Sequence, residues 1–194
     1  EDFFKERIHS IRRPRPDDFQ IKEAAEKIKK SKKPIIISGG GVFYSNAMEE
    51  LSNFAIKHNI PVTQTVMGYS TMKRNHSHYA GQIGGLGGKN TNELAKETDL
   101  AIAVGTKLAD FTTGSWANFE NENFNLLSIN VSRFDANKHL AQAVVGDAKV
   151  SLIELSKALG DWKVGDEWNK KSQRELKIWN DHIDKESAPT NQEI

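Results

Sequence analysis

The residues best suited to chemistry lie in one polar loop, Gly105–Trp116, whose sequence is GTKLADFTTGSW. Hydroxyl and carboxylate side chains, which can bind and orient a polar substrate, alternate there with aromatic rings, and the candidates are Asp110, Thr113, Ser115 and Trp116. The loop follows the apolar run Leu100–Val104, which is typical of a buried parallel strand. Ligands of open α/β sheets bind beyond the carboxyl ends of the strands, so the position of the loop favours binding. A surface connection anchored by one tryptophan is the alternative interpretation.

A glycine turn, Gly39-Gly40-Gly41, follows a second apolar run and is the next candidate. A turn of this kind before a helix can hold a phosphate, because backbone N–H groups point at it. The dinucleotide fingerprint requires a third glycine where this chain has Tyr44, and an acidic residue where the next strand ends in Gln64-Thr65. A nicotinamide dehydrogenase is therefore disfavoured, and a tight turn without a ligand is the preferred interpretation.

Two further patterns carry less weight. A glycine-rich segment, Gly81–Gly88, precedes a predicted short helix that Asn90 or Thr91 would cap. His76 and His78 supply only two metal ligands with no partnered acidic or cysteine residue, so we predict loop histidines and no metal site.

The elements that must position these residues alternate between strands and helices. Strands are predicted near the following segments: Pro34–Ser38, Pro61–Thr65, Tyr79, Leu100–Val104, Leu126–Val131 and Ala143–Val145. Helices are predicted to start at Asp17 or Asp18, at Ser45 or Asn46, at Asn90 or Thr91, and at Asp147, the first with Phe19 on its apolar face. This alternation predicts an α/β fold with a doubly wound, Rossmann-like parallel sheet of about six strands and helices on both faces.

Composition excludes several classes of protein. The 194 residues contain no cysteine, which rules out disulfides and zinc–thiolate sites and suits a cytoplasmic protein. The net charge is +1, with 27 basic and 26 acidic residues, so the composition gives no excess of positive charge that would favour binding to nucleic acid. No apolar run is long enough to span a membrane.

The Gly105–Trp116 loop closely resembles the middle domain of thiamine-diphosphate-dependent enzymes. Within that superfamily it is most similar to the hydrolases of 3D-(3,5/4)-trihydroxycyclohexane-1,2-dione, which act in myo-inositol catabolism. The resemblance covers roughly residues 17–160, is specific at this loop and is generic elsewhere. Shared fold alone would not fix a function.

The resemblance implies a parent enzyme that hydrolyses a C–C bond of the cyclic dione to give 5-deoxyglucuronate. Such enzymes bind Mg²⁺ and the diphosphate of the cofactor through a Gly-Asp-Gly…Asn-Asn stretch in the third domain, and a glutamate in the first domain activates the cofactor. Gly146-Asp147-Ala148 and Gly165-Asp166-Glu167 do not match that stretch, so we expect no catalytic residue on this chain and no activity from it alone. Thr113, Ser115 and Trp116 would lie at the substrate mouth, with Asp110 holding the loop; packing of the loop is the alternative role.

Several members of the superfamily hold the diphosphate of a flavin or ADP on glycine turns. The corresponding positions here form a candidate vestigial nucleotide site, namely Gly39, Gly40, Gly41, Gly84, Gly85, Gly105 and Asn130. Asn130 and Ser132 replace acidic residues, and Lys107 and Phe111 replace arginines, which favours a domain without FAD or ADP. Two alternatives stay open: an FAD- or ADP-binding middle domain of an acetolactate-synthase-like enzyme, and a non-catalytic protein-binding domain.

The resemblance also implies an organisation of the chain. Residues 1–16 are expected to be a linker from an N-terminal domain, 17–160 the Rossmann-like middle domain, and 161–194 a peripheral helix, packed through Trp162, Trp168 and Trp179, with a linker onward. Pro189-Thr190 has the pattern of a helix start in a third domain. The expected partners are the other two domains of the parent, a small-molecule substrate and further copies in a dimer or tetramer, without nucleic acid or membrane.

Overall fold

A parallel sheet of six strands forms the centre of the computed structural model, which describes residues 2–8 and 12–187. The strands are β1 (Pro34–Ser38), β2 (Val62–Gln64), β3 (Tyr79–Gln82), β4 (Leu100–Val104), β5 (Asn125–Asn130) and β6 (Gln142–Val145). Their order is β3-β2-β1-β4-β5-β6, and every neighbouring pair is parallel. The predicted doubly wound sheet is confirmed, with its topological switch point between β1 and β4.

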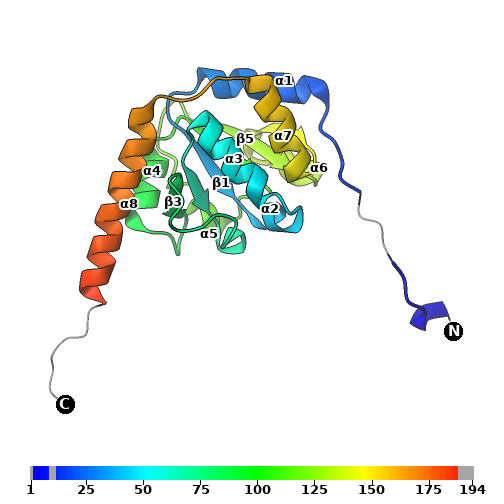
Figure 1. The fold of residues 1–194 in the computed structure, drawn as a ribbon, viewed down its shortest axis with the longest axis horizontal. Helices are drawn as coiled ribbons and strands as arrows, with labels where there is room; N and C mark the ends of the chain where they lie inside the picture. Colours follow the sequence, from blue (N-terminus) through cyan, green and yellow to red (C-terminus); the bar gives the residue numbers. More distant parts are fainter. Residues whose placement is uncertain (1, 9–11, 188–194) are drawn as a thin grey trace, which may run out of the picture.

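Helices cover both faces of this sheet (Figure 1). They are α1 (Asp18–Lys30), α2 (Gly40–Tyr44), α3 (Met48–His58), α4 (Lys89–Glu97), α5 (Asp110–Thr113), α6 (Arg133–Ala136), α7 (Ala148–Leu159) and α8 (Asp166–Glu186), with short 3₁₀ turns η1 (Asp2–Phe4), η2 (Val66–Gly68) and η3 (Lys138–Leu140). Buried residues of α1, α3 and α7 pack on one face, and those of α4 with Trp168 of α8 pack on the other. In the part of the chain that the structure describes, no helix combines the length and hydrophobicity needed to cross a membrane.

The two central strands are buried on both sides, which explains their unbroken apolar sequences. In β1, Ile36 faces the α1 side, while Ile35 and Ile37 face the α4 side. In β4, Ile102 faces the α1 side and Ala101 and Ala103 face the α4 side. Fully buried residues in both strands therefore fix their register against each other.

Two of the predicted helix caps are confirmed. The carboxylate of Asp17 accepts a hydrogen bond from the N–H of Phe19 at 2.9 Å, and that of Asp147 accepts from the N–H of Lys149 at 3.0 Å. Each carboxylate satisfies an N–H that has no partner within its helix.

The other two predicted helix starts are wrong. Ser45 and Asn46 follow α2 instead of starting α3, because the glycine turn leads directly into a short helix and Asn46 then adopts φ 52°. Helix α4 begins at Lys89, before the predicted caps. Both capping candidates there, Asn90 and Thr91, donate instead to the carbonyl of Ala80, at 3.2 and 2.8 Å, and so tie α4 to β3.

Phe19 also departs from prediction. Its side chain is 65% exposed, whereas Ile21, Ala24 and Ile28 are buried. Phe19 precedes Ile21 by two positions, so it points about 200° around the helix axis, away from the sheet.

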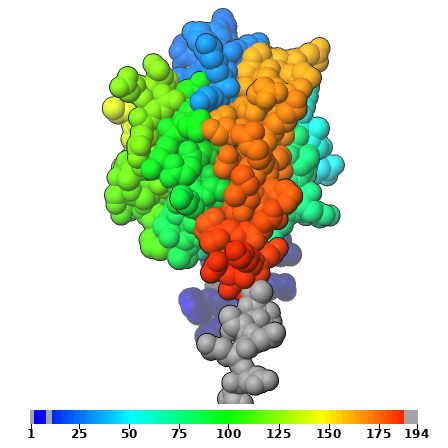
Figure 2. Space-filling model, turned by 90° about the vertical axis from the view of Figure 1, so that its left-hand side faces the viewer, coloured from blue at the N-terminus to red at the C-terminus, as the bar shows by residue number. Residues whose placement is uncertain are grey.

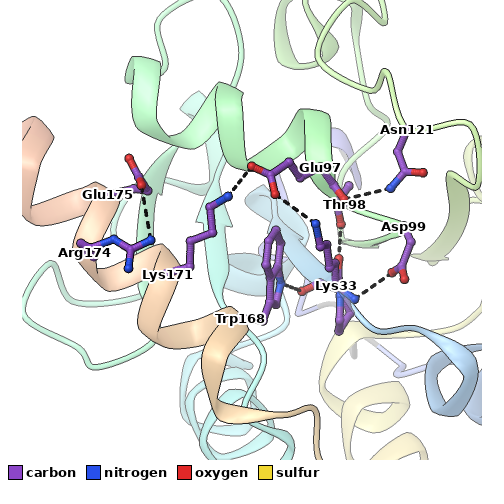
Figure 3. A network of polar contacts seen from close by, with 10 residues as sticks. Lys33, Glu97, Thr98, Asp99, Asn121, Trp168, Lys171, Arg174 and Glu175 are labelled. Carbon is purple, nitrogen blue, oxygen red and sulfur yellow. Dashed lines mark hydrogen bonds and ion pairs between the residues drawn. The ribbon is translucent and has the colours of Figure 1, made fainter.

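Helix α8 lies along the sheet edge beside α4, seen in Figure 2 as an orange-to-red band next to green. The indole Nε1 of Trp168 donates to the buried carbonyl of Pro34 at 2.8 Å. Next to it, Lys171 and Lys33 both bind the carboxylate of Glu97 (Figure 3). The hydrogen bond from Lys171 is the main reason why the pKa of Glu97 lies below its ordinary value. The N-terminal part of α8 is thus fixed to the body of the protein.

Candidate functional site

The candidate loop starts where β4 ends, at the carboxyl edge of the sheet. Gly105 has φ 61°, a conformation that glycine adopts without steric cost, and its N–H donates to the carbonyl of Ile129 at 2.9 Å. This turn directs Thr106 and the residues after it across the carboxyl ends of the strands.

The glycine turn after β1 packs backbone to backbone against Gly105. The N–H of Gly39 donates to Val104 O and that of Gly41 to Gly105 O, each at 2.9 Å. A Cβ at Gly41 would lie 2.6 Å from the Cα of Gly105, so no other residue fits without a backbone shift. Gly39, Gly41 and Gly105 therefore allow a close approach of two turns, and the N–H groups of these three already have partners.

Hydrogen bonds within the loop give it a fixed shape. The Oγ of Ser115 donates to Oδ2 of Asp110 at 3.1 Å, which spans the short helix α5. Thr113 is fully buried, and its Oγ1 accepts from the N–H of Trp116 at 3.3 Å. Gly114, Ser115 and Trp116 all have positive φ, at 59°, 54° and 69°. Of the four candidate residues, Asp110 and Ser115 are exposed, whereas the Thr113 hydroxyl faces inward.

The second glycine segment is packed under the loop. The N–H of Gly85 donates to Phe111 O at 2.8 Å, and Asn92 bonds both the N–H and the carbonyl of Gly84. A Cβ on Gly84 would lie 2.4 Å from Phe111 O. Asn118 completes the arrangement by donating to Asn92 at 3.3 Å. The amides of Gly84 and Gly85 are therefore engaged with protein atoms.

Trp116 joins the loop to a turn that precedes β6. Its indole lies 5.6 Å from the ring of Phe119 and 4.6 Å from the imidazole of His139, measured between ring centroids. A cleft of about 320 Å³ opens beside these rings, between Lys107 and Asp110 on the loop and Lys138 and His139 on the turn. The residues of the turn lie far from the loop in sequence, and no motif in the chain marks them.

A second cavity, of about 350 Å³, lies over the carboxyl ends of β4, β5 and β6. Asn130 lines this cavity, and both ends of its side-chain amide are bonded to backbone groups. The amide donates to Thr106 O at 3.3 Å and accepts from the N–H of Ser132 at 3.0 Å. The N-terminal segment runs along its rim: Arg13 pairs with both oxygens of Asp147 at 3.1 Å, and Pro14 O accepts from the N–H of Asp147 at 2.8 Å.

The aspartates of the two Gly-Asp sequences are engaged with other groups of the protein. Asp147 is already bound by Arg13 and by the start of α7, and Asp166 accepts from Asn59 at 3.1 Å. Within residues 2–8 and 12–187, no three His, Cys, Asp or Glu side chains are grouped to hold a metal ion. His76 and His78 instead bond Ser52 and Asn59, at 2.9 and 3.1 Å.

The chain is similar to known proteins over most of its length. A family model described as the central domain of thiamine pyrophosphate enzymes matches residues 21–155. A protein of Clostridium perfringens named 3D-(3,5/4)-trihydroxycyclohexane-1,2-dione hydrolase is 45% identical over 157 residues, which cover 81% of this chain and 25% of that protein. Proteins with the same name from Clostridium tetani and Bacillus cereus are 41% and 44% identical over 198 and 153 residues, covering 96% and 79% of this chain and 30% and 24% of theirs. The chain thus spans less than a third of the length of these relatives.

Proposed function

The chain belongs to the thiamine pyrophosphate enzymes as a central domain, and on that premise we propose that its parent protein hydrolyses a C–C bond of a cyclic 1,2-dione. The observation that carries the proposal is the 41–45% identity to proteins named trihydroxycyclohexane-dione hydrolase. The substrate would be the trihydroxycyclohexane-1,2-dione and the product 5-deoxyglucuronate, formed as water adds across the broken ring bond, in inositol catabolism.

The cofactor belongs elsewhere in the parent under this proposal. Thiamine diphosphate, held with Mg²⁺, supplies the stabilisation of the carbanion that C–C cleavage requires. This chain would position the Gly105–Trp116 loop. Its packed turns hold the loop at the carboxyl edge of the sheet, and the loop would face the substrate mouth. We further propose that the parent works as a homo-oligomer in the cytoplasm.

Each residue of the loop has a distinct part in the proposal. Asp110 and Ser115, which bond each other at 3.1 Å, would present a carboxylate and a hydroxyl to the substrate. Trp116 would form an apolar wall. Thr113 is buried and would only hold the loop.

The test is an assay of the whole parent protein with thiamine diphosphate, Mg²⁺ and the cyclic dione, with release of the acid followed by NMR. We expect turnover by the whole parent and none by the 194-residue chain. Formation of acetolactate from pyruvate, with no ring opening, would overturn the proposal.

Variants of the parent test the loop. Ser115→Ala and Trp116→Phe should each lower kcat/KM for the dione by about tenfold, the equivalent of about 1.4 kcal/mol. Lys22→Gln, a change on the exposed side of α1, is the matched control and should leave kcat/KM unchanged. If both loop variants kept the wild-type kcat/KM, the proposal that the loop lies at the substrate mouth would be wrong.

The proposal includes no flavin or ADP on this chain, since the amides of Gly39, Gly41, Gly84, Gly85 and Gly105 at the candidate turns have protein partners. Stabilisation by a ligand follows its occupancy of the folded state, so a thermal-shift series with FAD and ADP is decisive. We expect no shift of the melting temperature with either nucleotide. A saturable shift would favour the acetolactate-synthase-like alternative.

A further inference from the structure

The cleft between the loop and the 138–140 turn has the features of a ligand site. Its volume of about 320 Å³ is that of a site for a small organic molecule. Side chains of different chemistry converge on it from two separate segments: Lys107, Asp110 and Trp116 from the loop, and Lys138 and His139 from the turn.

Backbone strain is concentrated around this cleft. Among the described residues, eight non-glycine residues have positive φ, and five of them lie here. The five are Leu108, Ser115, Trp116, His139 and Leu140. Such conformations cost energy and persist where the surrounding structure enforces them, which is common at binding sites.

One ammonium group at the cleft has no internal ion pair among the described residues. Lys138 pairs with Asp135 at 2.5 Å and lies 4.4 Å from the ring centroid of Phe134. Lys107 makes no ion pair or hydrogen bond with any part of the chain that the structure describes, although its charge helps Lys138 to keep the pKa of Asp135 below its ordinary value. Two ammonium groups and two carboxylates, those of Asp135 and Asp110, thus lie at or beside the cleft. Because Lys107 has no ion pair among the described residues, its ammonium group is the one that can bind a ligand carboxylate.

The remaining groups favour a hydroxylated ligand. The Asp110 carboxylate, held by the Ser115 hydroxyl, can accept hydrogen bonds from ligand hydroxyl groups. The neighbouring rings of Trp116 and His139 present apolar surface on which the C–H groups of a polyol can pack.

We propose that this cleft binds a small polyhydroxylated carboxylate. The acid released in the proposed ring opening belongs to this chemical class, so an assignment of the cleft as a product subsite rests on the proposed function. Binding of the carboxylate itself depends only on this chain.

Titration of the 194-residue chain with D-glucuronate tests the proposal, with the indole N–H resonances of the tryptophans observed by NMR. We expect a saturable shift of the Trp116 resonance. Myo-inositol lacks the carboxylate and acetate lacks the hydroxyl groups. Each should therefore bind at least about tenfold more weakly than glucuronate, a difference of about 1.4 kcal/mol. Equal affinity for acetate and glucuronate, or no saturable shift of Trp116, would overturn the proposal.

Two variants and a control sharpen the test. Lys107→Gln removes the unpaired ammonium group, and His139→Asn removes the ring while asparagine tolerates the φ of 60°. Both should weaken glucuronate binding by about tenfold or more. Lys22→Gln, far from the cleft on α1, should bind as the wild type does. Circular dichroism confirms folding of each variant, and wild-type affinity in both folded variants would overturn the proposal.

Outcomes for the cleft and for the parent enzyme are separable. Ring opening by the parent without glucuronate binding here would overturn the cleft proposal alone. Glucuronate binding with no ring opening would overturn the proposed function and leave the cleft as a carboxylate site.

Discussion

Gly84 lies at the point where the two segments with binding chemistry touch. It has φ 101°, and its carbonyl and N–H are both bonded to Asn92. The next residue, Gly85, donates its N–H to Phe111 O but has a backbone that other residues can adopt. The backbone conformation therefore favours glycine at position 84 but not at position 85, and the sequence alone does not show this difference.

Alanine substitutions at Gly84 and Gly85 should therefore differ in their effect on stability. In Gly84→Ala the new Cβ would meet Phe111 O at 2.4 Å with φ in a disfavoured region, so we expect a loss of about 1–3 kcal/mol in the free energy of unfolding. In Gly85→Ala the Cβ would meet the ring of Phe111 at an ordinary 3.6 Å, and we expect a change within about 0.5 kcal/mol. Urea unfolding followed by circular dichroism measures both. Equal losses would show that the loop does not constrain this turn.

At the scale of elements, sequence patterns predicted which strands and helices exist better than where they start. Apolar runs such as Pro34–Ser38 and Leu100–Val104 are unambiguous, because both faces of a central parallel strand are buried. The start of α4 was mispredicted because Asn90 and Thr91 have the types of capping residues but bond Ala80 O across the fold. A local pattern cannot reveal that a long-range partner competes for a side chain.

Helix α8 should depend strongly on Trp168. Trp168→Phe would leave the buried carbonyl of Pro34 without its indole donor and replace the indole beneath Lys33, 5.6 Å away, by a smaller ring (Figure 3). An unpaired buried acceptor costs about 1–3 kcal/mol, so we expect a loss of that size in the free energy of unfolding. Trp179→Phe, on the same helix, removes a half-buried ring that makes no hydrogen bond with the described residues and is the matched control. Equal effects of the two substitutions would argue against a specific role for the Trp168 hydrogen bond.

At the scale of the whole molecule, the sequence predicted the doubly wound sheet and drew attention to the loop that lines one side of the candidate cleft. The loop wall was predictable because glycine, hydroxyl and aromatic residues follow a buried strand at the sheet edge where ligands bind. The opposite wall, with Lys138 and His139, was not predictable, because only the tertiary fold brings that turn to Trp116. The roles of Asp110, Thr113, Ser115 and Trp116 stay predictions that the parent enzyme must test.

Histidines that join separate parts of the molecule should make its stability depend on pH. His58 is fully buried, and its ring bonds Trp162 O at 2.6 Å and the Ser156 hydroxyl at 3.0 Å, which links α3, α7 and the segment leading to α8. Burial lowers the pKa of His58 below 6.5, with an opposing contribution from the Trp162 carbonyl, and burial also lowers the pKa of His76 and His78.

The sign follows from proton binding. Below pH 6.5 the unfolded chain takes up protons that the folded histidines still exclude, so the free energy of unfolding falls as the pH falls. At one pH unit below the unfolded value, His58 can contribute at most about 1.4 kcal/mol to this loss. Urea unfolding at pH 7.5 and 5.5 should therefore show a smaller loss in His58→Asn, whose amide can still donate to Trp162 O, than in the wild type. His182→Asn, a change at an exposed position of α8, should keep the full loss. If His58→Asn also kept it, the pH dependence would originate in other groups, and the link between α3 and α8 would not be sensitive to protonation.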